Sequence, residues 1–190
     1  SERDVDLSKY LAGTLALSAI LTLGVHMPES SAAPKKTLLW SEEFNSKAGT
    51  AVSSKNWNYD IGDGTEAGIP GWGNSEREYY IPSAIKQDGK GSAVISAKRM
   101  VVPAGGQTSK ANPYMCYYGT ACEWTSAKVT TLGKVGFQYG RMEARIKNPK
   151  GVGMWPAFWM LGSDIKTNPW PACGEIDIME AKGASPKTAF

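Results

Sequence analysis

The segment Gly174-Glu175-Ile176-Asp177-Ile178-Met179-Glu180 carries three carboxylates interleaved with apolar residues. This alternation predicts a strand, in which Glu175 and Asp177 share one face because side chains alternate with a period of two. Glu180 has the opposite parity and would point into the core, where an uncompensated carboxylate is costly. A β-bulge at Met179 would shift the register by one residue and return Glu180 to the shared face. We therefore expect three acids along one cleft.

Three clustered carboxyl groups suit the hydrolysis of glycosidic bonds. Two must flank the scissile bond, about 5 to 5.5 Å apart when a covalent intermediate forms and farther apart when water attacks directly. Neighbouring like charges push the pKa values of carboxyl groups apart, so one can act as an acid while another stays ionised. Asp177 would tune the other two. Taken alone, the motif is also compatible with a solvated acidic strand or a calcium site.

Other chemistries lack their residues. The single histidine, His26, lies in a predicted leader, so no His-based triad or zinc site remains after it. No phosphate-binding loop is present, and Gly71-Trp72-Gly73-Asn74 lacks the spacing of a dinucleotide fingerprint. The formal charge of +3 comes from scattered bases, with no basic run longer than Lys35-Lys36. Nucleic-acid binding is therefore not predicted.

Tryptophans surround the acidic segment in the sequence. Trp155 and Trp159 lie four residues apart, and Trp170 directly precedes a proline. Flat sugar faces pack on aromatic rings, and the indole N–H can hold a hydroxyl group, so these residues are candidate substrate platforms. Ordinary core tryptophan is the alternative for each residue taken alone.

Further motifs stand in a fixed order before the acidic segment: Trp40-Ser41-Glu42-Glu43-Phe44, Gly71 to Asn74 with Glu78-Tyr79-Tyr80, Tyr139 to Lys147, Trp155 to Gly162, and Trp170-Pro171. Together with the acids, they resemble glycoside hydrolase family 16, specifically the laminarinase-type endo-β-1,3-glucanases. The resemblance extends from Thr37 to Phe190. The extra residue matching Met179 is similar to laminarinases, agarases and carrageenases rather than to mixed-linkage lichenases.

The resemblance implies a concanavalin-like β-jelly roll of two curved antiparallel sheets, truncated at the C-terminus, with a substrate cleft on the concave face. It implies a retaining mechanism with Glu175 as nucleophile and Glu180 as acid/base, assisted by Asp177. Because the family's domain runs beyond the position matching Phe190, we expect poor activity from these 190 residues alone.

Further site residues follow from the same resemblance. Asn74 and Arg145 would bind sugar, as would the tryptophans Trp155, Trp159 and Trp170. A structural calcium would be bound through backbone oxygens near Glu43 and Gly89. No cofactor would be required for the chemistry.

The elements that must position these residues are predicted to be short strands. Glycine and proline, at 21 and 11 residues, interrupt the chain too often for long helices. The clearest strand runs from Phe137 to Lys147, where apolar and charged side chains alternate. Weaker strand patterns cover Thr37 to Phe44, Glu78 to Ile81, Ala93 to Met100 and Ala127 to Leu132. An all-β sandwich or barrel with long surface loops is predicted.

The chain divides into a leader, residues 1–33, and an incomplete catalytic domain, residues 34–190. The apolar stretch from Leu11 to Val25 has the length of a signal peptide core, which predicts secretion; a membrane-anchored leader is the alternative. Cys116 and Cys122 flank a short loop and form either a disulfide or two reduced thiols, and Cys173 is left over.

The predicted function is endo-acting, retaining hydrolysis of a laminarin-type β-1,3-glucan. The alternatives are the same mechanism on mixed-linkage glucan, agarose or carrageenan, and a noncatalytic β-glucan recognition protein. The expected partner is the polysaccharide substrate, with no stable membrane partner, and the protein is expected to be a monomer.

Overall fold

The computed structural model describes residues 36–185. The chain divides into two compact units, Ser1–Ser41 and Glu42–Phe190. All of the strands described below belong to the second unit. The predicted leader, residues 1–33, lies outside the described residues.

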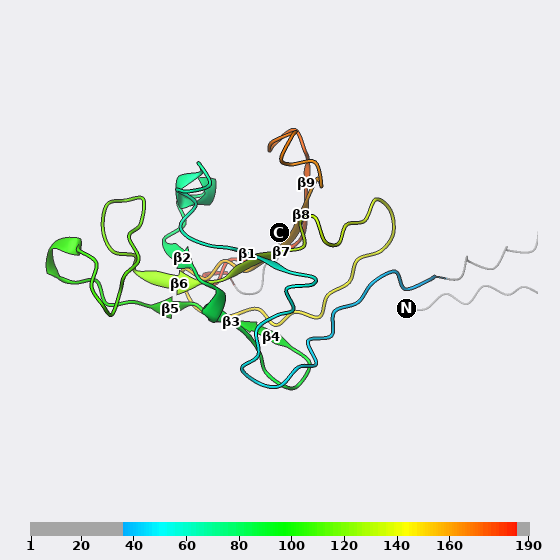
Figure 1. Ribbon diagram of the computed structural model, residues 1–190, viewed down its shortest axis with the longest axis horizontal. Helices are drawn as coiled ribbons and strands as arrows, with labels where there is room; N and C mark the ends of the chain where they lie inside the picture. Colours follow the sequence, from blue (N-terminus) through cyan, green and yellow to red (C-terminus); the bar gives the residue numbers. More distant parts are fainter. Residues whose placement is uncertain (1–35, 186–190) are drawn as a thin grey trace, which may run out of the picture. The chain divides into compact units, whose positions relative to one another are not determined.

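The described part of the second unit is built from short strands and three 3-10 turns, which confirms the all-β prediction (Figure 1). The strands are β1 (Asn58–Asp60), β2 (Glu78–Tyr80), β3 (Ile85–Gln87), β4 (Ala93–Ile95), β5 (Lys98–Arg99), β6 (Trp124–Ser126), β7 (Lys128–Thr130), β8 (Ala157–Leu161) and β9 (Glu175–Glu180). The 3-10 turns are η1 (Pro70–Gly73), η2 (Pro82–Ala84) and η3 (Ala104–Gly106).

The described strands pair into four small sheets. β1 pairs with β7, β3 with β4, and β8 with β9, all antiparallel. The remaining sheet has the order β2-β6-β5, in which β5 and β6 are antiparallel but β2 and β6 run parallel. That parallel pair is a local exception to the antiparallel sheets expected from the sequence.

A small hydrophobic core lies among β1, β3, β4 and β7. Val52, Ile85 and Ala127 are buried at its centre. Partly buried side chains pack around them: Phe44, Trp57, Tyr59, Ala84, Ala93 and Val129. Burial of these apolar groups stabilises the pairing of β1 with β7 and of β3 with β4.

The prediction of a strand from Phe137 to Lys147 is wrong. The segment shows the expected alternation, but no strand is assigned to it within the described residues. A strand needs a hydrogen-bonded neighbour as well as an alternating pattern, and this segment pairs with none of the described strands. Its Ile146 side chain stays exposed.

Two other strand predictions need correction. Residues 37–44 form no strand. Ala93 to Met100 holds two strands because the chain changes partner: β4 pairs with β3, whereas β5 pairs with β6. The predictions at Glu78 to Ile81 and Ala127 to Leu132 are confirmed by β2 and β7. Among the described residues, no helix has the length and apolar character needed to cross a membrane.

Candidate active site

The three carboxylates of the acidic segment lie on the hairpin of β8 and β9. The register between the two strands shifts by one residue between Phe158 and Trp159. The three acids lie opposite alternate residues of β8: Glu175 opposite Leu161, Asp177 opposite Trp159, and Glu180 opposite Ala157. Because directly paired residues point to the same side of a sheet and β8 is regular, the three acids share one face.

The bulge predicted from the sequence is present, but one position earlier than expected. Asp177 pairs with Trp159, and Met179 pairs with the neighbouring Phe158, so Ile178 is the residue without a partner. Met179 was predicted to be the extra residue. The alternation of side chains requires one extra residue between Asp177 and Glu180, but it cannot tell whether Ile178 or Met179 is that residue.

Two tryptophans bind the outer carboxylates directly. Trp155 Nε1 donates to Glu180 Oε1 at 2.6 Å, and Trp170 Nε1 donates to Glu175 Oε2 at 2.7 Å. Their side chains are 47% and 62% exposed, so both indoles keep ring surface available to a sugar. The sequence predicted that these tryptophans lie at the site but not that they orient its carboxylates.

The turn around Asn74 forms a second polar group. Asn74 Nδ2 donates to Glu76 Oε1 at 3.3 Å, and the Tyr80 hydroxyl lies 2.5 Å from Glu76 Oε2 and 3.0 Å from Glu78 Oε1. Burial, with a smaller contribution from the charge of Glu78, raises the pKa of Glu76 despite the hydrogen bonds from Tyr80 and Asn74. Burial and both neighbouring carboxylates raise the pKa of Tyr80.

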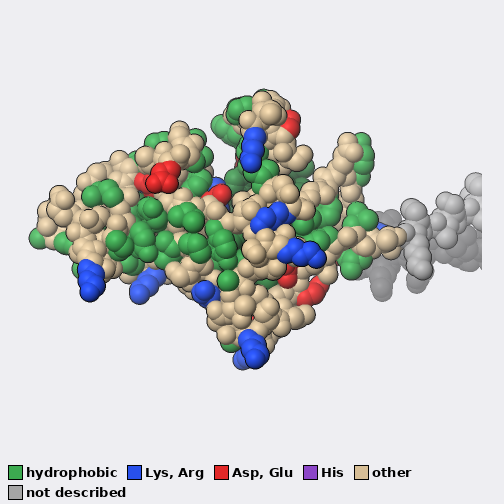
Figure 2. Space-filling view, in the orientation of Figure 1, with side chains coloured by type: hydrophobic (Ala, Val, Ile, Leu, Met, Phe, Trp, Pro, Cys, Tyr) green, Lys and Arg blue, Asp and Glu red, His purple; other side chains and the backbone are tan. Residues whose placement is uncertain are grey.

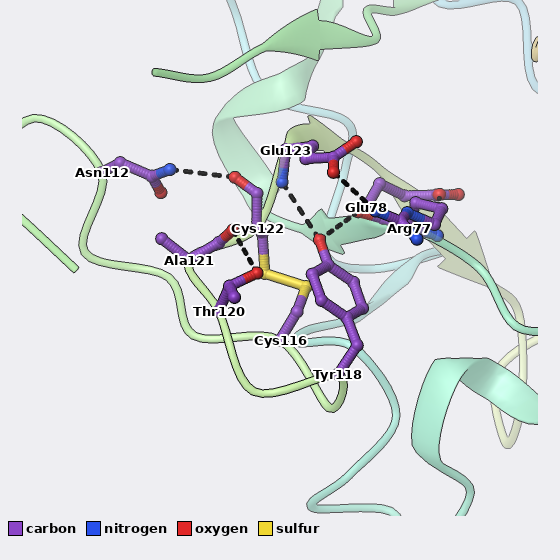
Figure 3. A network of polar contacts seen from close by, with 9 residues as sticks. All are labelled: Arg77, Glu78, Asn112, Cys116, Tyr118, Thr120, Ala121, Cys122 and Glu123. Carbon is purple, nitrogen blue, oxygen red and sulfur yellow. Dashed lines mark hydrogen bonds and ion pairs between the residues drawn. A yellow bond between two sulfur atoms is a disulfide. The ribbon is translucent and has the colours of Figure 1, made fainter. Parts of the chain in front are cut away.

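A disulfide-closed loop supports this turn. Cys116 and Cys122 are joined, which confirms the disulfide alternative (Figure 3). Cys173 is a free thiol. The Tyr117 ring packs so closely on Gly71 that a Cβ there would lie 2.9 Å from it. Gly71 also has a φ of 59°, so glycine satisfies both the conformation and the close approach.

Asp63 links the loop to the turn. Its carboxylate accepts backbone hydrogen bonds from Thr65 and Tyr117, and its carbonyl accepts the Trp72 N–H at 3.3 Å. Burial alone would raise the pKa of Asp63, but the hydrogen bonds from Thr65 and Tyr117 together outweigh it and lower the pKa. Asp63 gave no signal of this role in the sequence, because a lone Asp between glycines is typical of any turn.

An ion pair closes the other end of the loop. Arg77 binds Glu123 at 2.5 Å, and its guanidinium lies 4.5 Å from the centroid of the Tyr118 ring. The Tyr118 hydroxyl in turn accepts the Glu123 N–H at 3.2 Å (Figure 3). The loop is therefore attached through Tyr117 to Asp63 and Gly71, and through Tyr118 to Arg77 next to β2.

The comparisons with known proteins assign the fold to a family. Residues 84–189 match the family described as glycosyl hydrolases family 16. The chain belongs to this family. The β-glucanase of Rhodothermus marinus is 35% identical over 186 residues, which are 95% of this chain and 56% of that protein.

Solved structures of family 16 proteins agree with this assignment. The laminarinase from Flavobacterium sp. UMI-01 is 44% identical, with a TM-score of 0.64 over 80% of this chain and 55% of its own. The endo-β-1,3-glucanase from Pyrococcus furiosus is 39% identical, with a TM-score of 0.64 over 80% of this chain and 52% of its own. The fold is therefore the family's β-jelly roll, and the chain spans about half the length of each of these three proteins.

The family 16 resemblance also implied roles for Arg145 and for a calcium ion. Arg145 is exposed and makes no hydrogen bond or ion pair with another described residue, so its sugar-binding role stays a prediction. The Glu43 carbonyl oxygen and Asn45 Oδ1 lie 3.6 and 3.5 Å from where a Cβ on Gly91 would be, whereas a Cβ on Gly89 would meet Ala48, so the calcium site stays a prediction. Residues 36–185 hold no cluster of three His, Cys, Asp or Glu side chains suited to a metal.

Proposed function

We propose that this protein hydrolyses internal bonds of a β-1,3-glucan with retention of configuration. One observation carries the proposal. The bulge at Ile178 gives Glu175, Asp177 and Glu180 a shared face, although their spacing in a regular strand would divide them between two faces. The names of the similar proteins, laminarinase and endo-β-1,3-glucanase, support the choice of substrate.

In this proposal Glu180 protonates the leaving oxygen while Glu175 attacks the anomeric carbon to form a glycosyl-enzyme. Glu180 then takes a proton from water, which releases the sugar with its original configuration. Asp177 lies between them and tunes both through its charge. Trp155 and Trp170 hold the two glutamates in position through their indole N–H groups.

The test uses the complete gene product and laminarin, with reducing ends measured over time. We expect Glu175→Gln to lower kcat by roughly a thousandfold or more while glucan binding persists, because the amide cannot act as the nucleophile. Glu66→Gln, a substitution of an exposed glutamate in the same domain, is the matched control and should leave turnover unchanged. Full turnover by Glu175→Gln would rule out the assignment.

The same assay separates the alternatives. Cleavage of lichenan, agarose or carrageenan in preference to laminarin would keep the mechanism and change the substrate. Binding of laminarin without cleavage of any polymer would indicate a glucan recognition protein. The anomer released first, followed by NMR, distinguishes retention from inversion, since only the double displacement yields the original anomer.

Three further properties are proposals that rest on the sequence. The leader at residues 1–33 supports secretion of the domain formed by residues 34–190. The Glu43 carbonyl oxygen lies near Gly91, two residues from Gly89, which supports a structural calcium bound through backbone oxygens, with no cofactor needed for the chemistry. We propose that the complete protein acts as a monomer on its polysaccharide.

A further inference from the structure

Lys128 makes contacts with three different elements near the acidic face. Its ammonium lies 3.5 Å from Asp60 Oδ2, and the two side chains are only 24% and 31% exposed. The same ammonium lies 4.2 Å from the centroid of the Trp72 ring and 5.3 Å from that of the Trp159 ring. A cation is attracted to the face of an indole at both of these distances.

Trp72 is fixed independently of this lysine. Its Nε1 donates to the Gly62 carbonyl at 3.2 Å, and its ring lies against Tyr80 with centroids 5.7 Å apart. Asp60 is held by the pairing of β1 with β7. Lys128, the first residue of β7, therefore occupies a defined place between the fixed indole of Trp72 and the fixed carboxylate of Asp60.

Trp159 belongs to a different sheet from Lys128. It lies on β8 directly across from Asp177, between the positions opposite Glu175 and Glu180. The β8–β9 hairpin forms a sheet of its own among the described residues, with no strand pairing to β7. The contact with Lys128 therefore connects this indole to the part of the unit that carries Asn74.

We propose that Lys128 is a positioning residue that holds the Trp159 indole against the Trp72 side of the site and so sets the sugar subsite beside Asp177. The inference rests on the proposed function and extends it to a residue that the sequence did not mark. Lys128 acts through Trp159, because its ammonium is engaged by two rings and Asp60 rather than by a carboxylate of β9.

The test compares Lys128→Met with Lys128→Arg in the complete gene product. Methionine keeps the length of the side chain and removes the charge, whereas the guanidinium of arginine also stacks on indole faces and binds carboxylates. We expect Lys128→Met to raise KM for laminarin oligosaccharides about five- to tenfold and to change kcat less than about threefold, with most of the KM recovered in Lys128→Arg. Lys98→Met, on β5, is the matched control and should leave KM unchanged.

A double-mutant cycle with Trp159→Ala identifies the route of the effect. If Lys128 acts through Trp159, Lys128→Met adds little once the indole is gone, whereas multiplication of the two effects would overturn the inference. An unchanged KM in Lys128→Met would overturn it as well. If Lys128→Met fails to fold, Asp60→Asn provides the second variant, and it should raise KM in the same direction.

Failure of the proposed function gives a different result. A wild-type protein that binds laminarin without cleaving it would refute the hydrolysis, and the same five- to tenfold weakening in the laminarin Kd of Lys128→Met would still support the positioning role. A wild-type protein that neither binds nor cleaves laminarin would overturn both.

Discussion

Glu76 lies partly buried between Asn74 and Tyr80, and it is the acid near the site whose pKa is raised, first by burial. A raised pKa in the folded protein means that the folded state holds the proton more tightly than the unfolded chain. The energetic penalty of ionising Glu76 is absent below its ordinary pKa of 4.5 and develops as the pH rises through the folded value.

We therefore predict that Glu76→Gln, which cannot ionise, gains stability relative to the wild type as the pH rises from about 4 to 7. Urea denaturation at both pH values measures the difference in the free energy of unfolding. The exposed substitution Glu66→Gln, measured at the same two pH values, serves as the control. A constant difference between Glu76→Gln and the wild type across this range would contradict the prediction.

The residue types near the site were predictable, but several of their contacts were not. Aromatic rings close to an acidic strand in the sequence predict a sugar platform, which is why Trp155 and Trp170 were expected at the site. Their hydrogen bonds to Glu180 and Glu175 depend on how the chain turns after each strand, which the sequence pattern does not specify. Lys128 gave no signal, because a lysine on a strand is usually solvated.

The bulge in β9 is the element on which the acidic face depends. Removal of Ile178 would leave a regular strand in which Glu175, Asp177 and Glu180 still alternate on one face. Removal of Ile176 would instead place Glu175 next to Asp177, on opposite faces; with the bulge at Ile178 kept, Glu175 is then on the opposite face from Glu180 as well. The two deletions are matched, since each removes one isoleucine from the same strand.

We predict that the deletion of Ile176 lowers hydrolysis of laminarin by roughly a thousandfold or more, whereas the deletion of Ile178 retains measurable activity, reduced about tenfold by the changed strand length. Initial rates of reducing-end release measure both, and circular dichroism shows whether each variant folds. Equal activity of the two folded deletion variants would mean that Glu175 and Asp177 need not share one face, since the deletion of Ile176 separates these two acids whether or not the bulge is kept.

Short strands limited what the sequence could predict about the other elements. β2, β7 and β9 were found because their apolar alternation coincides with a hydrogen-bonded neighbour. Phe137 to Lys147 has the best alternation in the chain, yet it is not a strand, because alternation describes the two faces of a segment and not whether a neighbour is present. For the same reason, the parallel pairing of β2 with β6 left no mark in the sequence.

Residues 36–185 carry many exposed large apolar side chains. Figure 2 shows hydrophobic side chains spread across the visible face. Among the large ones, Val152 is 89% exposed, Tyr139 is 82% exposed and Ile176 is 60% exposed. Ile176 lies on the side of β9 away from the acids, and among the described strands β9 pairs with β8 alone. Contiguous exposed apolar groups and unpaired strand edges favour association.

We predict that the 190-residue chain, prepared by itself, binds the dye ANS and forms larger species as its concentration rises, with little hydrolysis of laminarin. ANS fluorescence and light scattering across a concentration series measure the two effects. Ile176→Thr should lower both, since threonine keeps the β-branched shape that suits a strand and removes apolar surface. Lys98→Thr, on a different sheet, is the control. A monodisperse monomer that binds no dye and turns over laminarin at the rate of the complete gene product would show that these surfaces need no further cover.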